Sequence, residues 1–436
     1  MKRVLAFFVV LTMLFGTALA AEITPQPTIT PVPSPTPMPE PMPSFVEARI
    51  ITHVLDEGQA VSGVRLEWDR EFRAGALTVD SFTINGYTIL GVYVNNDGVL
   101  YHAESAGKYV FLILEDPVGI GTQSHGTIQY KEGHNILRDV TLDIFSHKDA
   151  NMYTARTYIH DEVDDYLTGE ETNDGATTPY RLFVPDGWQK TQLPLVIWLH
   201  GAGERGTNNF TQIAANRGAL NYSDLEAQAE HPCFVLAPQA NDDGWDEKAL
   251  KNIHALVIKL MSEYNIDGSR IYVTGCSMGG MGSKALIYAY PEMIAATVVI
   301  ANSNFTYDED QIRNLTTIPA WLITGENDFP VRNPDAPDAI TDIKGNLAFM
   351  EGLGVRPVTF IENDGLNGFL RGQAAVMDIQ RVIDKAQQEN NHLIVTTYKV
   401  GTIEPSPHWS WMAATDNRAL RNWMFSFTKE PAFTGQ

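Results

Sequence analysis

The stretch RIYVTGCSMGGMGSKA, residues 270–285, decides the fold of this 436-residue chain. Its apolar start, residues 271–274, predicts a buried strand, and the small residues 279–285 predict the start of a helix. Between them, residues 275–279 match the pattern G-x-S-x-G. Its glycines let the backbone turn sharply, which would expose the Ser277 hydroxyl at the end of the strand. An ordinary glycine-rich turn gives the same pattern, so the surrounding sequence has to decide.

Further apolar runs of strand length lie on both sides of this stretch. They occupy residues 193–199, 233–236, 295–301 and 320–324. Continuous apolar runs are typical of parallel strands that are buried on both faces of a sheet. Between two of them, residues 246–264 carry apolar side chains at helical spacing. This alternation predicts a doubly wound α/β sheet with right-handed crossovers over residues 161–436.

A glycine-rich loop, His200-Gly201-Ala202-Gly203-Glu204-Arg205-Gly206, directly follows the predicted strand 193–199. If Ser277 is a nucleophile, an oxyanion hole needs two backbone N–H groups aimed at the developing negative charge. Met278, which follows Ser277, would supply one, and Ala202 in this loop would supply the other. The alternative is a phosphate-binding loop, but no Gly-Lys-Ser/Thr sequence follows.

A serine nucleophile also needs a histidine base, and two histidines follow Ser277 in the sequence. His392 stands at the start of a predicted strand, residues 393–400, and His408 stands after it. Catalytic groups of an open α/β sheet gather at the carboxyl ends of the strands. This position selects His408 as the base, and His392 is interpreted as an ordinary strand-end residue.

The base needs an acid that orients it and balances its charge. Asp328 lies a few residues after the predicted strand 320–324, where the acid of such a fold belongs. Glu326 in the same loop and Asp364 after the next predicted strand are the alternatives. The sequence therefore favours Asp328 as the partner of His408.

Three segments of different amino-acid composition precede the α/β region. Residues 1–20 have a basic start, an apolar run and the small-x-small ending Ala18-Leu19-Ala20, which together predict a signal peptide. Residues 21–44 form a Pro/Thr-rich linker, which is either a semi-rigid spacer or a solvated tail. Residues 45–160 show short alternating runs separated by Gly/Asn/Asp turns and predict an all-β, immunoglobulin-like sandwich.

Composition excludes several classes of protein. The 31 Lys and Arg residues face 53 Asp and Glu residues, a formal charge of −22, which argues against a nucleic-acid partner. No segment after the signal peptide is long and apolar enough to predict membrane insertion. Two cysteines exclude a disulfide-built scaffold and a four-cysteine zinc site. We expect no metal and no cofactor, and the sequence makes no prediction of oligomeric state. Trp245 and Trp411 either line a substrate pocket or pack elsewhere.

Taken together, these motifs resemble those of secreted bacterial α/β-hydrolase esterases with an N-terminal immunoglobulin-like domain, and polyhydroxybutyrate depolymerase-like and feruloyl esterase-like enzymes. The resemblance covers residues 179–427. It is carried by residues 275–280, 200–206, 237–239, 290–292 and 325–328 and by the pair His408 and Trp411. One departure is the separation of about 80 residues between Asp328 and His408, with a helical segment near residues 371–389.

The resemblance implies a secreted serine carboxylesterase that acts through an acyl-enzyme. Its substrate would be a small ester or an acetyl or feruloyl ester of a polysaccharide. A serine peptidase of the same fold and a polyester depolymerase are the alternatives. A third hypothesis is a binding protein with a vestigial hydrolase domain, but the complete set of Ser277, Asp328 and His408 argues against it.

Overall fold

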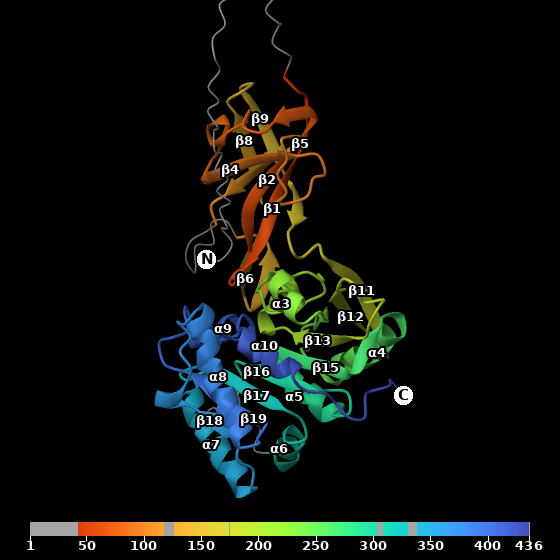
Figure 1. The fold of residues 1–436 in the computed structure, drawn as a ribbon, viewed down its shortest axis with the longest axis vertical. Coiled ribbons are helices and arrows are strands. Elements are labelled where there is room, and N and C mark those ends of the chain that lie inside the picture. Colours follow the sequence, from red (N-terminus) through yellow and green to blue (C-terminus); the bar gives the residue numbers. More distant parts are fainter. Residues whose placement is uncertain (1–41, 117–125, 174, 303–307, 330–337, 436) are drawn as a thin grey trace, which may run out of the picture. The chain divides into compact units, whose positions relative to one another are not determined.

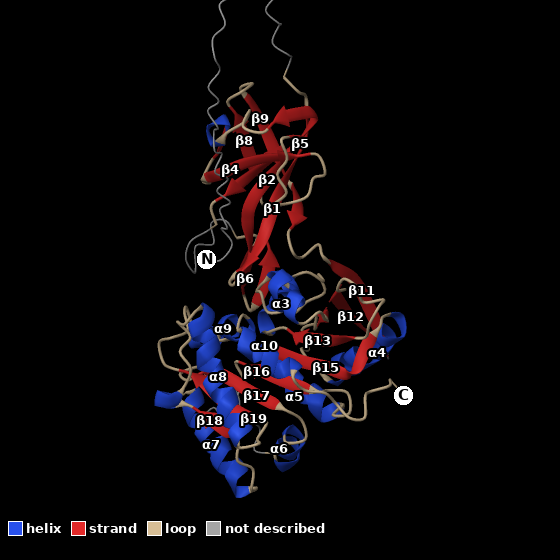
Figure 2. Ribbon diagram, in the orientation of Figure 1, coloured by secondary structure: helices blue, strands red, loops and turns tan. Residues whose placement is uncertain are grey.

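The protein is described by a computed structural model that covers residues 42–116, 126–173, 175–302, 308–329 and 338–435. The predicted signal peptide and most of the linker lie outside these residues. In the part described, no helix is long and apolar enough to cross a membrane. Figures 1 and 2 show a strand-rich N-terminal domain followed by a mixed α/β domain.

The N-terminal domain consists of short strands and one 3-10 turn. They are β1 (Phe45–Leu55), β2 (Gly58–Arg73), η1 (Val79–Ser81), β3 (Phe82–Ile84), β4 (Ile89–Asn95), β5 (Ala106–Leu114), β6 (Ile128–Lys131), β7 (His134–Leu137), β8 (Leu142–Ser146), β9 (Asn151–Ala155) and β10 (Thr157–His160). One sheet has the order β10-β1-β2-β5-β4, a second has the order β3-β8-β9, and β6 and β7 form a separate hairpin.

The core of this domain lies where alternate side chains of its strands meet. Trp68 of β2 is 1% exposed and makes edge-to-face contacts with Phe45, Phe72 and Tyr153. Large aromatic rings bury much apolar area and favour such edge-to-face geometry, so this cluster stabilises the packing of the strands. The predicted all-β sandwich is confirmed.

The second domain is built on one nine-stranded sheet. Its strands are β11 (Tyr166–Asn173), β12 (Ala176–Phe183), β13 (Leu193–Leu199), β14 (Phe234–Pro238), β15 (Ile266–Cys276), β16 (Ala296–Ile300), β17 (Ala320–Gly325), β18 (Val358–Phe360) and β19 (Leu393–Tyr398). Their order is β11-β12-β14-β13-β15-β16-β17-β19-β18. β12 pairs in antiparallel fashion with both of its neighbours, β11 and β14, and the strands from β14 to β18 in this order pair in parallel.

Helices cover both faces of this sheet. They are η2 (Ala202–Glu204), α1 (Thr211–Ala214), α2 (Leu220–Ser223), α3 (Leu225–Glu230), α4 (Glu247–Glu263), α5 (Met278–Ala289), α6 (Glu309–Leu315), α7 (Ala339–Gly352), η3 (Glu362–Asp364), α8 (Gly372–Gln388), η4 (Pro407–Trp409), α9 (Trp411–Thr415) and α10 (Arg418–Phe425). Side chains of α1, α2, α8 and α10 share one core cluster with Val196 and Trp198, whereas those of α4 and α5 share another with Leu195 and Ile197. Alternate side chains of β13 therefore pack into two separate cores, one on each face of the sheet. The predicted doubly wound α/β-hydrolase fold is confirmed.

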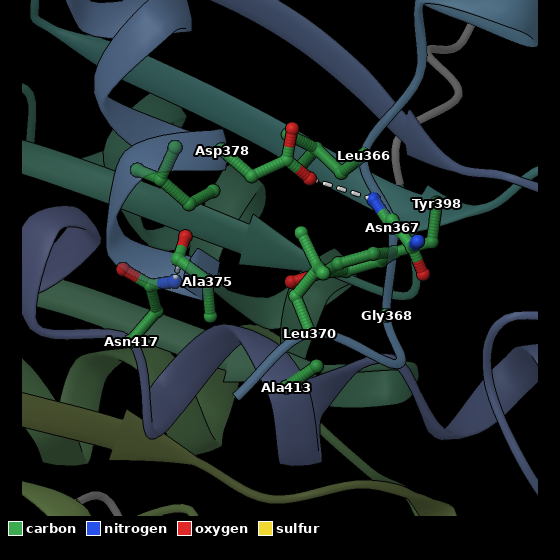
Figure 3. Close-up of a pocket in the computed structure, with 10 residues that line it drawn as sticks. Leu366, Asn367, Gly368, Leu370, Ala375, Asp378, Tyr398, Ala413 and Asn417 are labelled. Carbon is green, nitrogen blue, oxygen red and sulfur yellow. Dashed lines mark hydrogen bonds between the residues drawn. The ribbon is translucent and has the colours of Figure 1, made fainter. Parts of the chain in front are cut away.

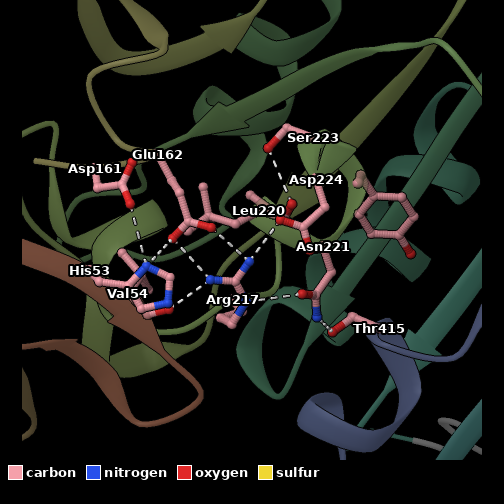
Figure 4. A network of polar contacts seen from close by, with 12 residues as sticks. His53, Val54, Asp161, Glu162, Arg217, Leu220, Asn221, Ser223, Asp224 and Thr415 are labelled. Carbon is pink, nitrogen blue, oxygen red and sulfur yellow. Dashed lines mark hydrogen bonds and ion pairs between the residues drawn. The ribbon is translucent and has the colours of Figure 1, made fainter. Parts of the chain in front are cut away.

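An ion-pair network joins the two domains around Arg217 (Figure 4). The Arg217 guanidinium donates to both carboxylate oxygens of Glu162, at 3.0 Å each, and to Asp224 Oδ1 at 2.8 Å. It also donates to the backbone carbonyl of Val54 in β1, at 2.7 Å. His53 Nδ1 lies 3.1 Å from Glu162 Oε2 on the other side. Because these groups are largely buried, removing Arg217 would leave Glu162 and Asp224 without this partner, which typically costs about 3–5 kcal/mol.

Two members of this network make stability depend on pH. Burial opposes charge on both, but His53 and Arg217 lower the pKa of Glu162 to about 2, and the carboxylates of Asp161 and Glu162 raise the pKa of His53 to about 9. Glu162 stabilises the fold above pH 4.5, and this contribution is lost as the pH falls toward 2. His53 stabilises the fold below pH 6.5, and this contribution is lost as the pH rises toward 9.

We therefore expect His53→Gln to flatten the fall in stability of the wild-type protein between pH 6.5 and 9. The measurement is the free energy of unfolding by urea at several pH values in this range. His147→Gln is the matched control, because His147 is an exposed histidine of the same domain that forms a hydrogen bond with the Thr83 hydroxyl. A His53→Gln protein with the wild-type slope would contradict the assignment of this pH dependence to the network.

Candidate active site

Ser277 occupies a sharp turn between β15 and α5. Its backbone angles are φ 55° and ψ −116°, a region that non-glycine residues rarely adopt, and its N–H donates to Ile300 O of β16 at 2.9 Å. The glycines on either side are required by close packing. A Cβ at Gly275 would lie 2.4 Å from Leu199 O, and one at Gly279 would lie 1.8 Å from the same atom. The turn therefore fits directly against the end of β13.

His408 and Asp328 complete a hydrogen-bonded chain with this serine. His408 Nε2 lies 2.9 Å from Ser277 Oγ, and His408 Nδ1 lies 2.8 Å from Asp328 Oδ2 and 3.0 Å from Oδ1. Asp328 is 2% exposed, and Thr324 Oγ1 and the Phe329 N–H also donate to its carboxylate. The structure thus brings together three side chains that are widely separated in the sequence.

A glycine at the end of β17 allows the loop that carries His408 to approach. A Cβ at Gly325 would lie 2.3 Å from Pro407 O, which is backbone and cannot easily move away. Pro407 opens the 3-10 turn η4, whose second residue is His408, and Ser406 caps this turn. In the sequence, Gly325 stands out only as part of the acid loop, and this contact was not predicted.

The two expected oxyanion donors both stand at the start of a helix. Ala202 opens η2 after β13, and Met278 opens α5 after Ser277. The N–H groups in the first turn of a helix have no partner within that helix, so they are free to bind an anion. Both elements begin at the carboxyl ends of adjacent parallel strands, β13 and β15.

Buried side chains support the loop that carries Ala202. His200 is fully buried, and its Nε2 accepts the N–H of Ala240 at 2.9 Å; burial lowers its pKa to about 4, so the ring is neutral. Gln239 Nε2 donates to Glu204 O at 2.9 Å. Trp245 is 9% exposed, and its Nε1 donates to His200 O at 3.1 Å. Of the two fates left open for Trp245, the geometry favours packing beneath this loop.

Aromatic rings surround His408. The Trp411 ring lies edge-to-face with the imidazole at 5.6 Å between centroids, and Trp409 stacks on Trp411. The centroid of the Phe329 ring lies 4.4 Å from that of the imidazole, and Phe329 is 57% exposed, so one side of its ring faces solvent. Phe329 was not predicted, because no local pattern marks a phenylalanine that follows the acid as a neighbour of the base.

The hydrogen-bonded chain of Ser277, His408 and Asp328 contains none of the alternatives considered from the sequence. His392 is exposed and contacts Phe427, and Asp364 is exposed in η3. Glu326 lies in the loop after β17, but Asp328 is the carboxylate that contacts His408.

Cys276 is buried beside Ser277, and burial raises the pKa of its thiol well above the usual value, which makes it a poor nucleophile. Both cysteines, Cys233 and Cys276, are free thiols.

A small cavity lined by Tyr398 of β19 and Asp378 of α8 is too narrow for a substrate (Figure 3). Its volume is about 20 Å³, which is room for a single water molecule. Asp378 of α8 accepts the N–H of Asn367 beside it, and Asn417 donates to Ala375 O. No residue of the Ser277–His408–Asp328 set lines this cavity.

Among the described residues, one cluster has the spacing of a metal site, and it lies in the N-terminal domain. Asp97, His102 and Glu104 offer ligand atoms within 4.8 Å of one another, and Asp97 already pairs with His102 at 2.7 Å. Asp97 and His102 are exposed, and solvated acidic loops commonly show such groupings. The cluster therefore gives no reason to assign a metal to the site around Ser277.

Comparison with known proteins places both domains in families. Residues 47–161 match the esterase Ig-like N-terminal domain, and residues 178–350 match the esterase PHB depolymerase family. A protein whose crystal structure is described as that of a thermostable esterase is 28% identical to this chain. The match covers 88% of this chain and 99% of that protein, with a TM-score of 0.66.

Two curated relatives match a shorter region. The poly(3-hydroxyalkanoate) depolymerase C of Paucimonas lemoignei is 28% identical over 149 residues, which are 31% of this chain and 33% of that protein. The probable acetylxylan esterase A of Aspergillus fumigatus is 26% identical over 140 residues, which are 30% of this chain and 36% of that protein. The chain thus spans only about a third of the length of each. Its two domains therefore match, in the same order, those of esterases that join an immunoglobulin-like N-terminal domain to a PHB depolymerase-type α/β-hydrolase domain.

Proposed function

We propose that this protein is a secreted serine carboxylesterase whose catalytic residues are Ser277, His408 and Asp328. The observation that carries the proposal is the hydrogen-bonded chain from Ser277 Oγ through the imidazole of His408 to Asp328, with contacts of 2.9 and 2.8 Å. This is the geometry that a general base needs in order to activate a hydroxyl nucleophile. The family of both domains supports the same reaction class.

In the proposed reaction, His408 takes the Ser277 proton as Oγ attacks the ester carbonyl carbon. The resulting oxyanion accepts hydrogen bonds from the N–H groups of Ala202 and Met278. His408 then protonates the leaving alcohol, and an acyl-enzyme remains on Ser277. Water then gives a proton to His408 and attacks the acyl-enzyme, and His408 returns this proton to Ser277 Oγ as the acid leaves. Asp328 holds the imidazole in the required tautomer throughout, so these side chains account for every proton transfer.

We propose acetyl or feruloyl esters of polysaccharides, together with small soluble esters, as the substrates. The acetylxylan esterase relatives favour an acetylated polysaccharide. β16 ends at Ile300 and β17 begins at Ala320, which leaves too short a segment for a large cap domain over the site. The exposed ring of Phe329 and the partly exposed Trp411 next to His408 offer surfaces on which a sugar or an aryl ring could stack.

A polyester is the second candidate substrate. It is favoured by the match to the PHB depolymerase family and by the depolymerase from Paucimonas lemoignei. A site without a large cap would also admit a polymer chain. A serine peptidase of the same fold is the remaining alternative, and it needs the same three catalytic side chains.

A panel of substrates separates these candidates. We expect the purified protein to hydrolyse p-nitrophenyl acetate faster than p-nitrophenyl octanoate, and to release acetate from acetylated xylo-oligosaccharides. Oligomers of 3-hydroxybutyrate, methyl ferulate and a dipeptide anilide complete the panel. Faster cleavage of the hydroxybutyrate oligomers would transfer the proposal to a polyester depolymerase, and cleavage of only the anilide would transfer it to a peptidase.

A further inference from the structure

The hairpin β6–β7 of the immunoglobulin-like domain touches the loop that carries the proposed oxyanion donor Ala202. Asn135 Nδ2 in β7 donates to Glu204 Oε1 at 2.7 Å. A Cβ at Gly203 would lie 2.8 Å from Asn135 Nδ2 and 3.2 Å from the Tyr130 ring, so glycine at this position lets the hairpin approach. The N-terminal domain therefore reaches the residues directly after Ala202.

Glu204 is a buried carboxyl that folds back beneath its own loop. It is 7% exposed and accepts a hydrogen bond from Asn135, and a Cβ at Gly201 would lie 3.2 Å from its Oε2, so the carboxylate also packs against Gly201. Gly201 and Glu204 lie on either side of Ala202 and Gly203. The carboxylate of Glu204 thus lies between Gly201, which precedes the proposed oxyanion donor Ala202, and Asn135 of the hairpin.

The other ionisable groups around this carboxyl do not neutralise it. His200 Nδ1 lies 3.9 Å away, but burial lowers its pKa to about 4, and burial keeps the Cys276 thiol protonated. Arg205 directs its guanidinium to the carbonyls of Ala202 and Asp242 instead. On the hairpin, His134 lies 3.8 Å from the Asp242 carboxylate. Asn135 is thus the side chain that meets Glu204 from the N-terminal domain.

We propose that Glu204 is a positioning residue for the oxyanion hole and that Asn135 of the immunoglobulin-like domain holds it in place. Glu204 does not touch the substrate; it fixes the turn so that the Ala202 N–H points at the reacting carbonyl oxygen. This inference rests on the proposed ester hydrolysis at Ser277. It assigns to the N-terminal domain a direct part in the geometry of the catalytic site.

If Glu204 only stabilised the fold, its replacement would impair catalysis by lowering the stability of the protein. The pH dependence of its contribution to stability gives a way to separate this from positioning. Burial raises the pKa of Glu204 to about 7, above its ordinary value of 4.5, so the folded protein binds this proton more tightly than the unfolded chain. Its effect on stability therefore worsens as the pH rises from 4.5 to 7, and above pH 7 the buried charge is destabilising. Replacing Glu204 with neutral glutamine should leave the Tm at pH 8 unchanged or higher, and yet impair catalysis.

The test compares the steady-state kinetics of four full-length variants on p-nitrophenyl acetate at pH 8. Loss of a whole oxyanion donor costs about 10²–10³-fold in kcat, so we expect misplacement in Glu204→Gln to cost about ten-fold, with KM nearly unchanged. Asn135→Ala should lower kcat about three- to ten-fold by the same mechanism. The kcat of the double variant should be no lower than that of Glu204→Gln, because both substitutions disrupt the same contact between Asn135 and Glu204. Asn151→Ala is the matched control, since Asn151 lies in β9 of the same domain and its side-chain amide donates to Asp149.

Hydrogen exchange in Asn135→Ala provides a readout that needs no turnover. We expect faster exchange of the backbone amides of residues 201–204 than in the wild-type protein. If the wild type hydrolyses no ester while this exchange rises, the proposed function fails and the positioning role stands. If the wild type is active and neither kcat nor exchange changes in Asn135→Ala, the positioning role is overturned. Wild-type kcat in a folded Glu204→Gln protein would overturn it as well.

Discussion

Replacing Ser277 with alanine is expected to lower kcat for p-nitrophenyl acetate by about a million-fold, to a residual rate about a thousand-fold above that in water. The loss is this large because His408 and Asp328 act only through the serine oxygen. The residual rate would come from the N–H groups of Ala202 and Met278, which still polarise a bound ester. Progress curves at high enzyme concentration, with the circular dichroism spectrum as a check on folding, measure the effect.

Cys276→Ala is the control for this change. Cys276 lies next to Ser277 in the sequence, but it is 1% exposed and protonated, so its loss should leave kcat within about ten-fold of the wild-type value. A Ser277→Ala protein that kept a tenth of the wild-type kcat would exclude Ser277 as the nucleophile. A large loss in Cys276→Ala would then make the thiol the candidate.

The second large effect is expected for Asp328→Asn, at about 10⁴-fold in kcat. The carboxylate accepts the N–H groups of His408 and Phe329 and the hydroxyl of Thr324. An amide in its place presents an NH₂ group to one of these donors, which favours the wrong tautomer of the imidazole or turns it away from Ser277.

Asp364→Asn is the matched control for the acid, because Asp364 is exposed in η3 and its backbone carbonyl is the atom that meets Arg381. We expect kcat in this variant to stay within about two-fold of the wild type, since exposed substitutions of this kind change little. The pH dependence of kcat/KM should shift in Asp328→Asn and not in Asp364→Asn. A larger loss in Asp364→Asn than in Asp328→Asn would contradict the assignment of the acid.

Residues that follow buried strands were predictable from the sequence. Ser277, Ala202 and Asp328 each lie within a few residues of the end of a continuous apolar run, and parallel strands place their carboxyl ends at one edge of the sheet. His408 was selected over His392 by the same argument. The strands at residues 193–199 and 320–324 were readable because both of their faces are buried, which leaves no polar alternation.

Contacts between residues of different secondary-structure elements could not be predicted from the sequence. Asn135 lies in a short hairpin whose local pattern predicts only strand and turn, and its contact with Glu204 spans 69 residues. Phe329 and Gly325 acquire their roles only once the chain returns with His408. The two possible fates of Trp245 could not be separated either, because burial depends on which loop folds over the ring. Such residues are defined by tertiary packing and carry no periodic signal.

Labelling with a fluorophosphonate probe, followed by peptide mass spectrometry, tests the proposed nucleophile most directly. The probe forms a covalent phosphonyl bond with an activated serine and needs the same base and oxyanion donors as an ester. We predict one adduct on the wild-type protein, on Ser277 in the peptide that contains residues 271–284, and loss of this adduct in Ser277→Ala and Asp328→Asn over the same reaction time. An adduct on Cys276 or on another serine, or undiminished labelling of Ser277 in Asp328→Asn, would contradict the account.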